Sequence, residues 1–130
     1  MVRRVIDATN AHDLEALTAC FAADYVNETP AHPARGFQGR DQVCRNWQQI
    51  FGAVPDVRVT ARTAVDPDGS TVWSEWSMTG TRLDGSSHHM AGVIIFGVHG
   101  SEISSARFYL EPVELGGGSV DDAIREATST

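Results

Sequence analysis

The hydrophobic periodicity of the chain changes once, near residue 56, and this change limits the fold more than any other feature. After it come four stretches of alternating character, at residues 57–65, 70–83, 88–98 and 103–113. Such alternation is typical of strands with one buried face. The connections are short and rich in turn formers, among them DPDG at 66–69 and Asp84-Gly85. Strands joined this way are antiparallel neighbours, so this half predicts an antiparallel sheet that twists and curls.

The first half has helical periodicity instead. Apolar spacing predicts a helix over residues 2–10 and a second one that Asp13 caps, with Leu14, Leu17 and Phe21 on its apolar face. A strand at 25–28 and a loop containing Pro30 and Pro33 follow, and then a helix over 41–51. We therefore expect an α+β fold in which the helices cover the concave face of the sheet.

Composition narrows the classes of function. A chain of 130 residues fits a single domain, and its net charge of −7 argues against nucleic-acid binding. No apolar run is long enough to cross a membrane, and no secretory signal follows Arg3 and Arg4. Cys20 and Cys44 lack metal-site spacing and are interpreted as reduced core thiols. We expect a cytoplasmic protein without a metal or organic cofactor, and no membrane or nucleic-acid partner.

The glycines at 116–118 separate the end of the chain from the rest. Ser119 can cap a short terminal helix, but the segment is polar. The expected organisation is one domain over residues 1–114 and a loosely held tail over 115–130.

The order of these elements is that of the nuclear transport factor 2-like superfamily, and within it the chain resembles the SnoaL-like branch, named for polyketide cyclases. The resemblance covers roughly residues 2–114. It rests on NAHDLEAL at 10–17, FAADYV at 21–26, WSMTGT at 76–81, GSEI at 100–103 and RFYLE at 107–111. It implies a fold also called a cystatin-like roll, in which the helices and a curved sheet enclose a cone-shaped pocket. It also implies a small hydrophobic ligand and a homodimer formed through the convex sheet face, near Trp73.

Alternation on the last strand places Arg107, Tyr109 and Glu111 on one face, and Phe108 and Leu110 on the other. In the resembled family, the acid that ends this strand faces the cavity, so the first set is expected inside. Glu111 would then move a proton, while Arg107 or Tyr109 stabilises negative charge. The alternatives are a structural ion pair between Arg107 and Glu111, or a solvent-exposed strand end.

The neighbouring strands supply the remaining candidates. The family match at Trp76 turns Trp76 and Met78 inward and Trp73 outward; the reverse would bring Glu75 inside. On residues 88–98 the inner face carries Phe96 and His88. His88 is a possible acid–base partner because imidazole titrates near neutral pH, although its place near a hairpin end favours the interpretation of a solvated turn histidine.

Tyr25 and Asn27 could hydrogen-bond a substrate carbonyl, and Trp47 on the third helix would cover the pocket. Steroid isomerases of the superfamily have a catalytic Asp before a proline where this chain has Thr29-Pro30, so that chemistry is not expected.

Three functions remain open from the sequence. The first is a cofactor-independent enzyme of cyclase, isomerase, dehydratase or hydrolase type that acts on a hydrophobic oxygenated molecule. The second is a ligand-binding or dimerising domain without catalysis. A weaker third is an accessory subunit that uses the surface near Trp73.

Overall fold

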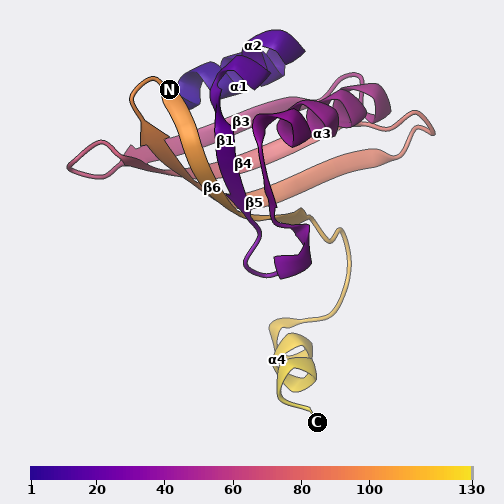
Figure 1. Cartoon of the computed structure of the whole chain (residues 1–130). Coiled ribbons are helices and arrows are strands. Elements are labelled where there is room, and N and C mark those ends of the chain that lie inside the picture. The colour runs from indigo at the N-terminus through magenta and orange to yellow at the C-terminus, as the bar shows by residue number, and fades with distance from the viewer. Residues whose placement is uncertain (130) are drawn as a thin grey trace.

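The computed structural model describes residues 1–129 and shows an α+β fold built on one open, curved sheet (Figure 1). The sheet has six strands in the order β2-β1-β6-β5-β4-β3. Its strands are β1 (Phe21–Glu28), β2 (Phe37–Gln38), β3 (Arg58–Val65), β4 (Thr71–Thr81), β5 (Ser87–His99) and β6 (Glu102–Pro112). The described helices are α1 (Val2–Asn10), α2 (Leu14–Ala19), α3 (Arg40–Ala53) and α4 (Val120–Thr128), with a 3-10 turn at Pro33–Arg35. The predicted fold class is confirmed.

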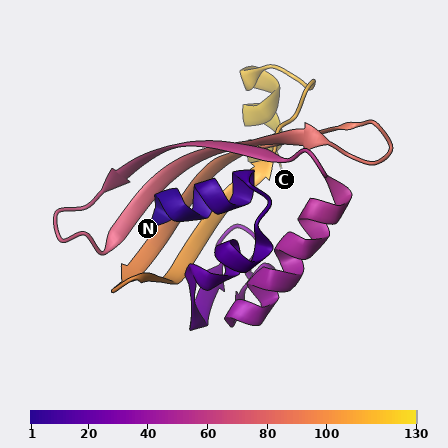
Figure 2. The ribbon, with the colours of Figure 1, turned by 90° about the horizontal axis from the view of Figure 1, so that it is seen from above.

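Helices α1, α2 and α3 lie on the same side of the sheet (Figures 1 and 2). Helix α1 buries its predicted apolar residues, and Val5 and Ile6 are each 2% exposed. Asp13 caps α2 as predicted, because its side chain accepts a hydrogen bond from the Ala16 amide at 3.0 Å. The core therefore sits between these helices and the concave face.

The predicted end of the second helix is wrong. Helix α2 stops at Ala19, and Phe21 opens strand β1 instead of closing the apolar helical face. The cause is tertiary: the Cys20 carbonyl accepts a hydrogen bond from the Ile103 amide at 2.8 Å, and Phe21 then pairs with Ile103 in a parallel arrangement. Pairing with a distant strand overrides a local helical pattern.

The four-strand meander is confirmed, with β3, β4, β5 and β6 antiparallel in chain order. Strand β4 has the predicted faces: Trp76 is 2% exposed and Met78 is 4% exposed, whereas Trp73 is 51% exposed. At mid-sheet, Gly92 has a φ of +150°, and a Cβ there would collide with the Tyr109 carbonyl oxygen. A glycine is required where two strands approach this closely.

Strand β6 contains a β-bulge that reverses its predicted faces. Gly97 pairs with Ser105 and Val98 with Ile103, so Ser104 is an extra residue without a partner. Ile103 and Ala106 are both buried, at 0% and 1% exposure, although they are three residues apart. Beyond the bulge, every side chain therefore points opposite to simple alternation from Ile103.

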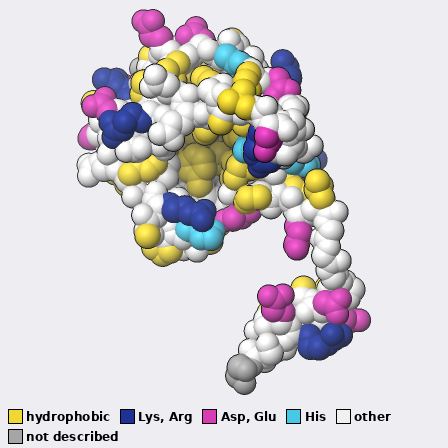
Figure 3. Space-filling view, turned by 90° about the vertical axis from the view of Figure 1, so that its right-hand side faces the viewer, with side chains coloured by type: hydrophobic (Ala, Val, Ile, Leu, Met, Phe, Trp, Pro, Cys, Tyr) yellow, Lys and Arg dark blue, Asp and Glu magenta, His cyan; other side chains and the backbone are white. Residues whose placement is uncertain are grey.

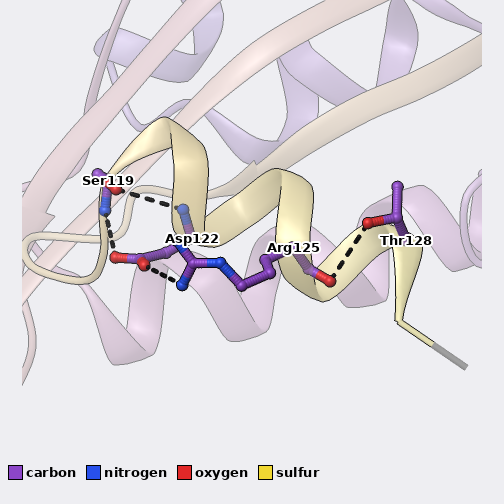
Figure 4. A network of polar contacts seen from close by, with 4 residues as sticks. All are labelled: Ser119, Asp122, Arg125 and Thr128. Atoms are coloured by element: carbon purple, nitrogen blue, oxygen red, sulfur yellow. Dashed lines mark hydrogen bonds and ion pairs between the residues drawn. The ribbon is translucent and has the colours of Figure 1, made fainter.

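Helix α4 stands apart from the rest of the molecule, beyond the glycine linker (Figure 1). It is stabilised from within by a capping box, in which the Asp122 amide donates to Ser119 Oγ at 3.2 Å and the Ser119 amide donates to Asp122 Oδ2 at 3.0 Å (Figure 4). Arg125 Nη1 also donates to Asp122 Oδ1 at 3.0 Å. Its apolar residues Val120 and Ile124 are 74% and 59% exposed.

Candidate functional site

A cavity of about 270 Å³ lies between α3 and the concave face of the sheet. Its wall is mostly apolar and comes from α3 and from strands β1, β2, β4, β5 and β6. The lining residues are Phe21, Tyr25, Asn27, Thr29, Arg35, Phe37, Val43, Asn46, Trp47, Ile50, Met78, His88, Met90, Phe108 and Leu110. Figure 3 shows a hollow lined by hydrophobic side chains, with basic, acidic and histidine side chains close to its rim.

Some of the predicted aromatic residues line the cavity, and others lie beneath it in the core. Trp47 lines the cavity and lies 5.6 Å from Phe51, centroid to centroid. Trp76 and Phe96 lie deeper, around a void of only about 20 Å³ that shares Trp47 and Met78 with the main cavity. Trp76 Nε1 donates to Ser74 Oγ at 2.8 Å, so its polar group is already satisfied within the protein. Trp76 and Phe96 thus form the floor, and Trp47 and Met78 touch the open space.

Tyr25 and Asn27 form a polar pair on β1. The Tyr25 hydroxyl donates to Asn27 Oδ1 at 2.7 Å, and the two residues are 1% and 7% exposed. Burial raises the pKa of the Tyr25 phenol well above its usual range, because the phenolate would lose its hydration. Tyr25 therefore stays protonated and orients the amide of Asn27, whose Nδ2 donor is left available.

His88 is the titratable base in this wall. It lies near the start of β5, opposite Gly80, and its Nε2 atom is buried with no hydrogen-bond partner among the described residues. Burial lowers the pKa of His88 because the charged imidazolium loses hydration, and the nearby charges of Arg82 and His89 lower it further. His88 is thus neutral near pH 7, with a polar atom ready for a partner.

Arg107, Tyr109 and Glu111 do not line the cavity, and their predicted inward orientation is wrong. They pair with Ile95, Val93 and Ala91 of β5, which lie on the convex face with Trp73, Glu75 and Ser77 of β4. Tyr109 is 41% exposed. The bulge at Ser104 is the physical reason: it turns Phe108 and Leu110 inward in their place.

Glu111 has a different partner from the one expected. Its Oε1 lies 2.8 Å from His32 Nε2, in the loop that follows β1. The His32 carbonyl in turn accepts a hydrogen bond from the Arg35 amide at 2.9 Å. The end of β6 is thereby tied to the loop that places Arg35 at the cavity wall.

Three residues that line or support the cavity were not among the candidates predicted from the sequence. Arg35 and Asn46 line the cavity, and His32 holds the loop to Glu111. Asn46 lies on the same face of α3 as Val43 and Ile50, because Asn46 is three residues and Ile50 seven residues after Val43. This helical spacing could have identified Asn46 as a cavity residue. The loop residues gave no such signal, because a loop has no periodicity.

No aspartate or glutamate of the described chain lines the cavity. Residues 1–129 also contain no group of three or more His, Cys, Asp or Glu side chains arranged to hold a metal ion. The polar residues of the wall carry two amides, two hydroxyls, a guanidinium and an imidazole. They can hold an oxygenated molecule, and the imidazole can accept or deliver a proton.

Comparisons with known proteins agree with the fold. A family model described as a SnoaL-like domain matches residues 2–106. An NTF2-like protein of Exiguobacterium superposes with a TM-score of 0.70 at 19% identity, over 87% of this chain and 98% of that one. No protein among those with curated descriptions matches in sequence.

Two further neighbours are from Mycobacterium tuberculosis. One, in complex with estradiol-17beta-hemisuccinate, has a TM-score of 0.72 at 20% identity, over 83% of this chain and 88% of that one. The other, an LEH-like epoxide hydrolase, has a TM-score of 0.71 at 19% identity, over 85% and 79%. At such identities the likeness establishes the fold alone. No helix within residues 1–129 is both long and apolar enough to cross a membrane.

Proposed function

The chain belongs to the family of SnoaL-like domains, and from that premise we propose that its cavity binds a small hydrophobic, oxygenated molecule and carries out acid–base chemistry on it without a cofactor. The observation that carries this proposal is the buried, unpartnered Nε2 of His88 in a mostly apolar cavity. An unsatisfied buried polar atom costs about 1–3 kcal/mol, so it is retained where a ligand supplies the partner.

The roles follow from the geometry. His88 is neutral near pH 7 and can take a proton from carbon or oxygen. Asn27, oriented by Tyr25, would donate to the oxygen on which negative charge develops. Trp47 and Met78 would hold the apolar body of the molecule. A neighbour with a bound steroid hemisuccinate supports a small-molecule ligand for this fold.

A second candidate is a binding domain without catalysis. It is favoured by the lack of any described Asp or Glu in the cavity wall, since a carboxylate in an apolar site is a common general base for proton abstraction from carbon. The two candidates share the ligand and differ only in whether His88 moves a proton.

Proton exchange in heavy water separates the candidates. Benzylacetone, a small hydrophobic ketone, would be incubated with the protein, and deuterium uptake next to its carbonyl would be followed by mass spectrometry. We expect uptake above the buffer rate, and its loss in His88→Gln although this variant still folds and unfolds cooperatively. Thermal stabilisation by benzylacetone without exchange would favour the binding domain. If neither this ketone nor a panel of ketones of similar size stabilises the protein or undergoes exchange, both candidate functions are overturned.

We also propose that the protein is a cytoplasmic homodimer that associates through the convex sheet face. Trp73 and Tyr109 are exposed there by 51% and 41%, and Ile95 lies between them and is buried. Exposed aromatic residues on one sheet face are typical of an interface. The two free cysteines are consistent with a reducing compartment.

A further inference from the structure

We propose that the natural ligand is a small amphipathic acid, whose carboxylate is held by Arg35 at the cavity mouth while its apolar body lies against Trp47. This inference rests on the proposed small-molecule function and deepens it, since it names the chemical class of the ligand.

Arg35 is a cation without a counter-charge. It lines the cavity, and it takes part in none of the ion pairs found among residues 1–129. Because no described Asp or Glu lines the cavity, its charge is not neutralised from the wall. Arg35 is exposed, so its guanidinium is open to a ligand at the edge of the apolar space. A guanidinium presents a planar fork that matches a carboxylate, so the missing charge is best supplied by the ligand.

The position of Arg35 is held by the rest of the fold. The Arg35 amide donates to the His32 carbonyl at 2.9 Å, and the His32 ring contacts Glu111 at 2.8 Å. His32 and Glu111 are therefore positioning residues for this loop, and Glu111 is engaged with His32 instead of neutralising Arg35.

The two amides of the wall are donors as well. Asn27 Oδ1 accepts from Tyr25, and Asn46 Oδ1 accepts from Gln42 Nε2 at 2.7 Å, which leaves the Nδ2 donors of both amides for a ligand. A wall with donors and one cation matches a molecule with acceptor oxygens and a negative charge.

The volume limits the size of that molecule. About 270 Å³ holds roughly nine water-sized atoms at the ~30 Å³ that one water occupies in the liquid. Bonded atoms pack more closely, so an aromatic or branched acid somewhat larger than this fits.

A matched ligand series tests the inference. Phenylpropionate, phenylpropionamide, phenylpropanol and phenylpropylamine share one apolar body and differ at the polar end. Binding to the full chain would be measured by isothermal titration calorimetry. We expect phenylpropionate to bind about threefold to tenfold more tightly than the amide, the range for a partly exposed charge-assisted contact. The amine should bind most weakly.

Variants assign the preference to Arg35. Arg35→Gln should remove the difference between acid and amide while leaving amide binding unchanged. Arg58→Gln, the same substitution at an exposed arginine of β3, should keep the difference. Equal binding of acid and amide in the unmodified protein would overturn the carboxylate assignment and leave the small-molecule function standing. No binding of the acid, the amide or the alcohol would overturn both.

Discussion

The buried, unpartnered Nε2 of His88 lowers the stability of the fold and is the proposed base of the cavity. The protonation of His88 links its pKa to the pH dependence of stability. The pKa of His88 is lowered in the folded protein by burial, whereas an unfolded histidine has a pKa near 6.5. Below that pH the unfolded chain binds the proton more tightly than the folded chain does. The free energy of unfolding contributed by this residue is therefore intact above about pH 6.5 and falls as the pH drops through the lower, folded pKa.

This linkage can be measured with one substitution. His88→Gln removes the titrating group. The stability of this variant relative to the unmodified protein should therefore rise as the pH falls from about 7.5 to about 5. Denaturant unfolding at several pH values gives the comparison. His99→Gln, at the exposed end of β5, serves as the control and should follow the unmodified protein. A constant difference between His88→Gln and the unmodified protein across this range would contradict the assigned direction.

Single residues also show where sequence reasoning stops. Tyr25, Asn27, Trp47 and Met78 were predicted as pocket residues from alternation and family motifs, and the structure places all four in the cavity wall. Glu111 was predicted from the same motifs, yet its side chain contacts His32. The difference is that the first four keep the alternation or helical spacing of their immediate neighbours, whereas the side of β6 that Glu111 occupies depends on an irregularity earlier in the strand.

At the scale of elements, that irregularity is Ser104. Without the extra residue, Arg107, Tyr109 and Glu111 would turn toward the apolar cavity, and Phe108 and Leu110 would turn out to solvent. Burying a guanidinium and a carboxylate there would cost several kcal/mol, more than a strand of this length recovers elsewhere.

Deletion of Ser104 is therefore expected to destabilise the fold by about 3 kcal/mol or more. Ser104→Ala is the matched control, since it keeps the bulge and loses only the hydrogen bond from Ser104 Oγ to the Gly97 carbonyl, at 3.2 Å. That loss is worth about 1 kcal/mol. Urea unfolding of both variants checks this, and equal midpoints would show that the bulge does not set the faces of β6.

At the scale of the molecule, helices α1, α2 and α3 leave the convex face of the sheet uncovered (Figure 2). Trp73 is 51% exposed on this face, beside an exposed ion pair in which Arg62 Nη2 lies 2.9 Å from Glu75 Oε1. In a dimer related by a two-fold axis, each substitution is introduced twice, so a single charge at this position is strongly disruptive.

Trp73→Glu should accordingly convert a dimer into a monomer at micromolar concentration, as followed by sedimentation velocity. Leu83→Glu, which places the same charge at another apolar residue that is 79% exposed, should leave the dimer intact. A monomeric unmodified protein would contradict the proposed assembly outright.

The sequence by itself suffices for the fold class and the meander, because hydrophobic periodicity and turn residues are local properties that any neighbouring structure must respect. The cavity and the faces of β4 were expected from the family resemblance. The tertiary structure alone decided which polar groups reach the cavity. Pairing of Cys20 and Phe21 with Ile103 ended α2 early, and one unpaired residue, Ser104, exchanged the two faces of β6. Strand register and bulges are settled by contacts between distant segments, so no local pattern in the sequence carries them.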